Sequence, residues 1–481
     1  MGNLFSSDGW LCMGVNAASD AMWTYVLIAV LLCCAVWFTF RTRGVQFRML
    51  REMVRLLGDS AVSTRGEKKV SSFQAFAVSV ATRVGTGNLA GVATAIAVGG
   101  PGAVFWMWLI SLLGSATAFV ESTLAQLFKK KSSDSFIGGP AYYILQGLKK
   151  PWLAALFAIL ISVTFGLSYN SIQSNTICSA LNVAFGFDPK IVGIVLTVLS
   201  LGVIFGGIHR IARVSSVIVP IMAVGYLLLA LYVVLSNLGM IPQVFAMIFK
   251  DAFGVTQIAG GGIGATMMNG IKRGLFSNEA GEGSAPNVAA TASTSHPVKQ
   301  GLIQALGVFT DTLVVCSCTA FIILFSGLDT TSGLNGIALT QAALEAQIGA
   351  FGKNFIAVAI LLFAYSSIIG NYYYGEVNIR FLSSLRGGGN PYRGGTALFV
   401  YRILSGGVMV IFGAFASLDL VWSLGDFFMA LLTAVNLFAI VLLSKYVFRL
   451  LADYDSQKRS GIREPVFRRS LFPDLDLDCW E

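Results

Sequence analysis

Residues 77–100 read AVSVATRVGTGNLAGVATAIAVGG, an apolar stretch long enough to cross a bilayer, with glycines at its centre. Residues 254–274, GVTQIAGGGIGATMMNGIKRG, repeat this pattern. A helix that unwinds inside a membrane frees N–H and C=O groups that lipid cannot satisfy, so it is tolerated only where it lines a polar cavity. The two stretches therefore predict two broken membrane helices that together line a binding site.

The two stretches belong to a chain that is apolar throughout. Of its 481 residues, 55% are apolar and 12% are charged, whereas about 25% of the residues of a soluble domain are charged. We expect an all-α integral membrane protein with eleven transmembrane helices, near residues 20–40, 71–98, 103–128, 153–178, 190–208, 212–236, 251–275, 300–326, 354–382, 397–415 and 418–448.

The basic residues indicate the orientation, because positively charged loops stay in the cytoplasm. The first span is followed by RTRGVQFRMLREMVRLL, the reverse of the charge order of a cleaved signal peptide, so we expect this span to be retained. Most basic residues fall on one side of the threaded chain, and only Lys190, Lys250 and Lys353 fall on the other. We expect a multi-pass protein of the bacterial inner membrane with its N-terminus outside and its C-terminus in the cytoplasm. The net charge of +9 then reflects topology and anionic lipid rather than nucleic acid.

Without the first span ten spans remain, and glycine interrupts the first and the sixth of these. They are equivalent positions in two halves of five, and because five is odd the second half must be inverted relative to the first. The expected organisation is an outer segment, first helix and basic cytoplasmic linker (1–70), a first five-helix repeat (71–236), a second, inverted repeat (251–448) and a cytoplasmic tail (449–481). Close packing of helices is the alternative use of such glycines.

Broken helices of this kind suit a zwitterion and a cation. Positive half-helix ends attract a carboxylate, and free carbonyls hold a cation. A small neutral amino acid with sodium satisfies both, and no organic cofactor is expected. The seven cysteines show no metal-binding spacing, the two histidines lie at helix ends, and no GxxxxGK[ST] motif occurs. These observations argue against an enzyme and an ATP-driven pump. The sequence distinguishes poorly between a carrier and a channel or sensor.

Four motifs resemble blocks of a known family: GGPGAVFWMWLISLLG (Gly99 to Gly114), VGTGNLAGVATAI (Val84 to Ile96), GGPAYYI (Gly138 to Ile144) and GLFSNEAGEGSAPN (Gly274 to Asn287). The chain resembles the alanine or glycine:cation symporters, also called sodium:alanine symporters, whose relatives share the leucine-transporter-like fold of the amino acid-polyamine-cation superfamily. The resemblance implies sodium-coupled uptake of alanine or glycine, with serine as a further substrate, by alternating access. It leaves the oligomeric state open.

The resemblance also implies site residues. The amino acid carboxylate would lie against the backbone of the first break, and polar side chains on later helices would complete the pocket; the substrate set is Gly85, Thr86, Gly87, Asn170, Gln173, Gly262, Ser367 and Asn371. The alternative role of an intramembrane Asn or Gln is a hydrogen bond between helices. Asn88 would coordinate sodium, and a second sodium site would comprise the carbonyls of Ala81 and Val84 with the hydroxyls of Ser366 and Ser367, since sodium prefers oxygen ligands.

One position departs from the family pattern. The chain reads Ser367-Ile368-Ile369-Gly370-Asn371 where the resemblance leads us to expect a tryptophan in place of Asn371. A short amide would make the pocket wider and more polar. Glutamine, asparagine and serine therefore become alternatives to alanine.

Charged residues within the apolar stretches need partners or a wet cavity. Arg83 lies inside the first break, with Glu121, Glu376 and Asp426 as candidate ion-pair partners and a direct role in carboxylate binding as the alternative. Asp311 and Glu121 could instead carry protons, which keeps proton coupling open. A further pair, Glu279 and Glu282, is expected at a cytoplasmic helix end, as part of a gate or as caps of that end.

Overall fold

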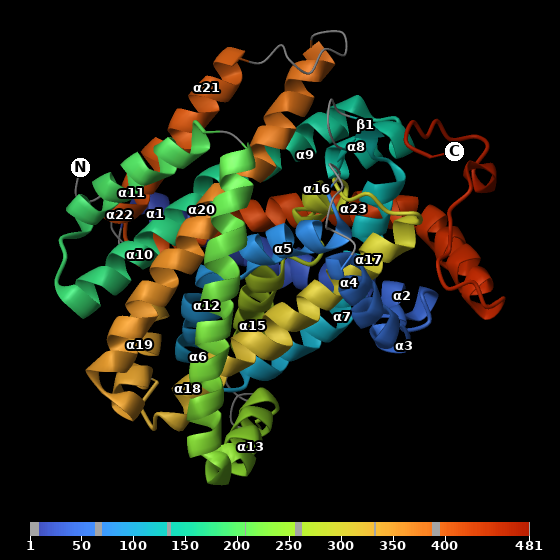
Figure 1. Ribbon diagram of the computed structural model, residues 1–481. Helices are drawn as coiled ribbons and strands as arrows, with labels where there is room; N and C mark the ends of the chain where they lie inside the picture. Colours follow the sequence, from blue (N-terminus) through green and yellow to red (C-terminus); the bar gives the residue numbers. More distant parts are fainter. Residues whose placement is uncertain are drawn as a thin grey trace.

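The computed structural model describes residues 9–62, 70–131, 136–206, 208–254, 262–330, 333–386 and 395–480. These residues are almost entirely helical (Figure 1). A short antiparallel pair is the exception within this part of the chain, formed by β1 (Lys130–Lys131) and β2 (Phe136–Ile137). The expected all-helical class is therefore present.

The first span is one continuous rod of α1 (Trp10–Met22), the π-helical turn η1 (Trp23–Leu27) and α2 (Ile28–Arg41). It ends where Arg43 and Gly44 adopt left-handed backbone conformations, with φ of 56° and 62°. Two helices of the linker follow, α3 (Val45–Arg48) and α4 (Leu50–Val62).

The predicted break in the next span is present. Helix α5 (Ser72–Arg83) begins with a capping box between Ser71 and Gln74 and ends at Arg83, where Val84 is extended with φ −73° and ψ 101°. The chain resumes as η2 (Gly87–Gly91) and α6 (Val92–Gly99). Residues Val84 to Thr86 therefore interrupt the regular backbone hydrogen bonding inside the span.

The chain continues as far as residue 236 through a further series of helices. The series consists of α7 (Ala103–Leu127), α8 (Pro140–Tyr143), η3 (Ile144–Leu148), α9 (Pro151–Val163), η4 (Thr164–Tyr169), α10 (Asn170–Phe185), α11 (Pro189–Ile204) and α12 (Ile208–Ser236). The short η5 (Leu238–Met240) leads into α13 (Ile241–Ala252), a helix that the sequence did not predict, and the chain bends by 72° between α12 and α13.

The second broken helix differs from the prediction. The sequence predicts unwound backbone over Gly260 to Gly264, within the second glycine-rich stretch. Gly262 is the first residue of α15 (Gly262–Asn278), so this prediction is wrong for Gly262 to Gly264, and Gly260 and Gly261 lie outside the described residues. The helix breaks instead after Asn278, and α16 (Ala285–Ala289) follows. Between them Glu279, Gly281 and Gly283 have φ of 56°, 95° and 79°, a left-handed backbone that only glycine adopts freely.

The remaining elements are α17 (Pro297–Phe309), η6 (Thr310–Cys316), α18 (Ser317–Phe325), α19 (Gly336–Ile348), α20 (Ala350–Arg386), α21 (Gly395–Ile403), η7 (Leu404–Val408), α22 (Met409–Phe415), α23 (Leu418–Arg459) and η8 (Arg469–Leu471). Helices α5, α7, α15 and α17 lie at the centre of the bundle, and α11, α13 and α21 lie on its outside (Figure 1). Among the described residues, seven helices are long and apolar enough to span a membrane, or eight when the bent pair of α12 and α13 counts as one span. A multi-pass membrane protein is thus present, and the count of eleven stays a prediction.

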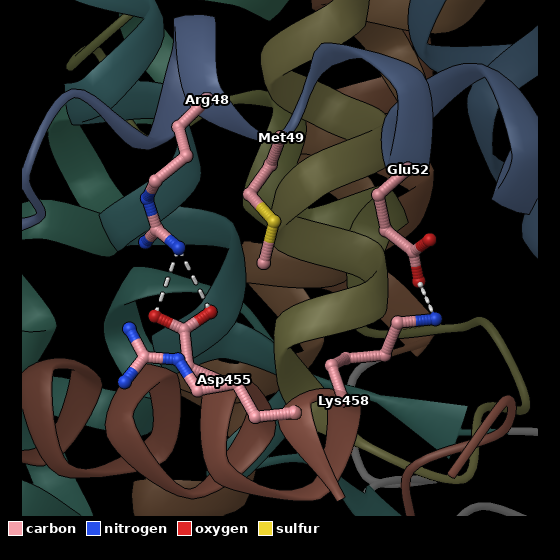
Figure 2. A pocket seen from close by; sticks show the side chains of 6 residues that line it. Arg48, Met49, Glu52, Asp455 and Lys458 are labelled. Atoms are coloured by element: carbon pink, nitrogen blue, oxygen red, sulfur yellow. Dashed lines mark hydrogen bonds and ion pairs between the residues drawn. The ribbon is translucent and has the colours of Figure 1, made fainter. Parts of the chain in front are cut away.

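The C-terminal tail folds back onto the end of the bundle where α2 ends (Figure 1). The Phe467 N–H donates to the Ser295 carbonyl at 2.9 Å, and the Trp480 indole N–H donates to the Leu127 carbonyl at 3.1 Å. The linker joins the same surface beside a small pocket, where Arg48 pairs with Asp455 at 2.9 Å (Figure 2).

Glu52 completes the attachment of the linker to α23. Its carboxylate pairs with the Lys458 ammonium at 3.2 Å (Figure 2) and accepts a hydrogen bond from the Tyr454 hydroxyl at 2.6 Å. Burial raises the pKa of Glu52, but hydrogen bonds from Arg55, Tyr454 and Lys458 outweigh burial and lower this pKa to about 2. The attachment is therefore electrostatic and requires the ionised carboxylate.

Candidate functional site

The two broken helices meet at their breaks. A Cβ added to Gly87 would lie 3.0 Å from the Ser277 Cα and 3.1 Å from the Phe276 ring, so the first break packs directly on the last turn of α15. Further along, a Cβ at Gly99 would lie 3.4 Å from the Thr266 Cα. The two helices run side by side from Ser277 to Thr266, and Gly262 lies one turn beyond Thr266. Gly262 is therefore remote from the break at Gly85 to Gly87, contrary to its expected place in the substrate pocket.

Side-chain oxygens satisfy the backbone donors that the first break frees. The Gln173 Oε1 accepts from the Thr86 hydroxyl at 2.5 Å and from the Thr86 N–H at 3.3 Å. The Asn88 Oδ1 accepts from the Gly85 N–H at 2.9 Å. A carboxylate oxygen has the same acceptor chemistry as these amide oxygens. The donors are thus free to exchange a side-chain amide for the carboxylate of a ligand.

A buried carboxylate faces Asn88 from η6. The Asp311 Oδ1 accepts from the Asn88 amide at 2.7 Å, and its Oδ2 accepts from the Ser277 hydroxyl at 2.7 Å and the Thr312 hydroxyl at 3.1 Å. Asn88 also lies 3.3 Å from the Cys316 sulfur. All of these partners are neutral, so the negative charge of Asp311 has no cation among them. The sequence suggests only a proton-carrying role for Asp311, because this acidic residue lies within an apolar stretch.

Hydroxyls and carbonyls gather on the other side of α5. The Ser366 hydroxyl donates to the Ala81 carbonyl at 3.4 Å, and the Ser367 hydroxyl donates to the Thr82 carbonyl at 3.3 Å. Both distances are near the upper limit for a hydrogen bond, and the Ser366 hydroxyl also lies 2.7 Å from the Phe363 carbonyl. Val84 follows the last residue of α5 as its extended C-cap. The structure therefore places these hydroxyls against the carbonyls of Ala81 and the unpredicted Thr82, and a role for the Val84 carbonyl stays a prediction.

The remaining predicted pocket residues form a chain of amides. The Asn371 amide on α20 donates to the Asn170 Oδ1 on α10 at 3.1 Å. The Asn170 amide in turn donates to the Ser405 hydroxyl at 3.0 Å. Asn170 and Asn371 are 0% and 1% exposed. Asn170 lies one turn from Gln173 on α10, and Asn371 lies one turn from Ser367 on α20. Their amide groups can both donate and accept hydrogen bonds.

Glu121 fixes the break after α15. Its carboxylate accepts from the N–H groups of Gly281 and Gly283, each at 3.2 Å, and from the Asn436 amide at 2.8 Å. These donors are backbone groups that the broken helix leaves free. Glu121 therefore positions the break and is not the partner of Arg83.

Glu279 and Glu282 follow the end of α15 and lie inside the protein, 3% and 0% exposed. The Glu279 carboxylate accepts from the Ser284 hydroxyl, and the Glu282 Oε2 accepts from the Tyr169 hydroxyl at 3.1 Å. Asn278 caps the end of α15 instead, through a bond from the Ala280 N–H to its Oδ1 at 3.0 Å. Glu279 directly follows the last residue of α15, in agreement with the expected helix end, whereas the cytoplasmic side and the gating role stay predictions.

Arg83 forms none of its predicted ion pairs. Asp426 pairs with Arg273 at 2.5 Å, and Glu376 pairs with Arg380 at 2.6 Å. Arg83 is 2% exposed, and within the described part of the chain its guanidinium donates one long bond, 3.4 Å from Nη1 to the Gln304 carbonyl. The candidate partners were wrong because each has a nearer basic or backbone donor.

Comparison with known proteins gives consistent matches along the whole chain. The sequence profile of the sodium:alanine symporter family matches residues 9–469. The chain is 52% identical to the "Probable sodium/glutamine symporter GlnT" of Bacillus subtilis (strain 168), over 97% of this chain and 95% of that protein. It is 49% identical to the "Amino-acid carrier protein AlsT" of the same organism, over 97% of each. It is 37% identical to the "Sodium/proton-dependent alanine carrier protein" of Bacillus sp. (strain PS3), over 89% of this chain and 97% of that protein. All three names describe carriers and not enzymes.

Proposed function

The chain belongs to the sodium:alanine symporter family, and we propose that it takes up a small neutral amino acid, alanine or glycine and also serine, together with sodium by alternating access. The observation that carries this proposal is the capping of the Thr86 N–H and hydroxyl by the Gln173 amide oxygen. A ligand carboxylate that replaces this oxygen would accept the same two hydrogen bonds. The amino acid carboxylate then satisfies the donors of the first break, and the Gln173 side chain is released to contact the carboxylate or the ammonium group of the ligand.

The coupling ion would bind on both sides of this break. At the first site Asp311 supplies carboxylate oxygens, with the Ser277 and Thr312 hydroxyls beside them, and Asn88 would turn its oxygen from the Gly85 N–H toward the ion. At the second site the carbonyls of Ala81 and Val84 and the hydroxyls of Ser366 and Ser367 supply a neutral oxygen set. Hard oxygen ligands suit sodium. Proton coupling through Asp311 is the alternative, since a relative is named for sodium and protons.

Glutamine or asparagine is the second candidate substrate. The hydrogen-bonded amides of Asn371 and Asn170 favour it, because a substrate amide could replace either partner in that pair. A pocket built for an amide would discriminate strongly against alanine, whose methyl group leaves the polar groups unpaired. The relative with 52% identity is named for glutamine, which agrees with this candidate.

Alternating access would use the two broken helices. The proposed arrangement is two inverted halves of five helices, with α5 and α15 as their first members. The N-terminus would lie outside and the basic linker and tail in the cytoplasm, because positive charge is retained on that side. Glu279 and Glu282 would then move with the break as the halves rock.

Sodium-induced thermal stabilisation of the purified carrier tests the first ion site without amino acid. We expect Asn88→Ala and Asp311→Asn each to abolish the stabilisation while the protein still inserts into the membrane. Asn269→Ala is the matched control, since Asn269 is partly buried on α15 and its amide donates within this helix, to the Ala265 carbonyl at 2.9 Å. Full sodium stabilisation in both site variants would rule out this ion site.

A further inference from the structure

Arg83 is a buried cation with unused hydrogen-bond donors. Its Nε and Nη2 have no partner in the part of the chain that the structure describes. An arginine in a membrane interior is costly unless it is paired or hydrated. Such an arrangement calls for a second position in which the guanidinium is paired.

Four buried carboxylates lie within electrostatic range of this guanidinium, and none of them forms an ion pair with it among the described residues. They are Glu121 on α7, Asp311 on η6, and Glu279 and Glu282 in the break after α15. All four accept hydrogen bonds from neutral donors: Glu121 from backbone N–H groups, Glu279 from Ser284, Glu282 from Tyr169, and Asp311 from Asn88, Ser277 and Thr312. Asp311 differs because it lies at the proposed sodium site.

The resting place of Arg83 is one turn away from Asp311. A Cβ added to Gly307 would lie 2.4 Å from the Arg83 Nη1, so the guanidinium rests directly against this glycine. Gly307 and Asp311 are four positions apart on the continuous helix of α17 and η6, a spacing that places them on one face about 6 Å apart. A side chain as long as arginine can cover that distance by changing its rotamer.

Asp311 needs either a counter-cation or a proton in every state of the transport cycle. The hydrogen bonds from Asn88, Ser277 and Thr312 are all neutral, and a buried carboxylate that loses its counter-charge is strongly destabilised. Sodium would supply the charge when the carrier is loaded. When sodium leaves, a different cation must take its place or the carboxylate must be protonated.

We propose that Arg83 is a tethered counter-cation for Asp311, which competes with sodium for this carboxylate and neutralises it while the empty carrier returns. The structure holds Arg83 in the displaced position, against Gly307. The inference rests on the proposed sodium site at Asn88 and Asp311. Arg83 acts as a positioning residue: it sets the affinity for sodium and the rate of the empty return.

Two substitutions shift this competition in opposite directions. Arg83→Gln removes the competitor, so we expect the sodium concentration for half-maximal thermal stabilisation to fall by about threefold or more. Gly307→Ala fills the resting place and drives the guanidinium toward Asp311, so this concentration should rise by about threefold. Gly264→Ala is the control, since a Cβ there meets nothing within 4 Å.

Transport gives an independent readout that does not depend on sodium affinity alone. Arg83→Gln should slow net uptake, which requires the empty return, more than it slows exchange of internal for external amino acid. Arg83→Lys keeps the charge on a different side chain, so it should restore net uptake in part.

Shifts of both variants in the same direction, or no shift in either, would overturn the role of Arg83 and leave a structural arginine. If Asp311→Asn keeps the full sodium response, the sodium site itself fails and this inference fails with it. A loss of the response in Asp311→Asn without opposite shifts in Arg83→Gln and Gly307→Ala refutes only the inference about Arg83.

Discussion

Gly85 leaves no room for a methyl group, and this gives a direct test of how the first break is packed. A Cβ at Gly85 would lie 2.5 Å from the Ser367 Oγ and 3.4 Å from the Gln173 Oε1. Gly85 is not among the glycines with positive φ, so alanine is compatible with its backbone and the effect of Gly85→Ala is one of space. Overpacking of this kind costs about 1–3 kcal/mol, which corresponds to about 5- to 150-fold in affinity.

We expect Gly85→Ala to weaken amino acid binding by a factor in this range, measured as the half-saturation concentration for sodium-driven uptake in proteoliposomes. Gly264→Ala is the matched control and should transport normally. The same substitution in a Ser367→Ala background should have a much smaller further effect, because the clashing oxygen is gone, and thermal stability supplies the readout if Ser367→Ala itself stops transport. Normal uptake by Gly85→Ala, or equal effects in both backgrounds, would refute the packing of Ser367 on the break.

Three further predictions concern the substrate pocket, the C-terminal tail and the linker. Asn371→Trp removes the amide that donates to Asn170 and narrows the pocket, so glutamine should compete less well against alanine uptake. An unchanged competition profile would show that Asn371 does not line the pocket. Trp480→Ala deletes a side chain that is 8% exposed and should cost about 3–5 kcal/mol of stability, seen as a lower Tm, whereas Trp10→Ala, at 73% exposed, should leave the Tm unchanged. The pKa of Glu52 is lowered to about 2, so wild type should be more stable than Glu52→Gln above about pH 4.5 and lose this advantage as the pH falls toward 2; an advantage that is independent of pH would contradict the ion pair.

The sequence predicted the first break correctly and the second at the wrong position, and the difference is physical. Glycine allows a helix to unwind but does not require it, and Gly262 to Gly264 remain helical. The second break forms where Glu121 captures the N–H groups of Gly281 and Gly283. Glu121 is remote from this segment in the sequence, so local composition could not reveal the contact.

The site residues divide in the same way. Gln173, Ser366 and Ser367 lie against the first break as expected, because the resemblance to a known fold placed their helices beside it. The partners of Arg83 could not be predicted, since the outcome depended on which basic residue lay closest to each acid. Asp311 gained its place opposite Asn88 from the packing of η6, which has no signature in the sequence.

The most direct test of sodium-coupled amino acid uptake is transport of labelled alanine and labelled glutamine into proteoliposomes, with an inward sodium gradient and with sodium replaced by choline. The account predicts accumulation of at least one of the two labels in sodium and its loss in choline. Preference for alanine would select the first proposed substrate, and preference for glutamine would select the second. Equal uptake in sodium and choline would contradict the sodium sites, and uptake of neither label in sodium would contradict the proposed substrates.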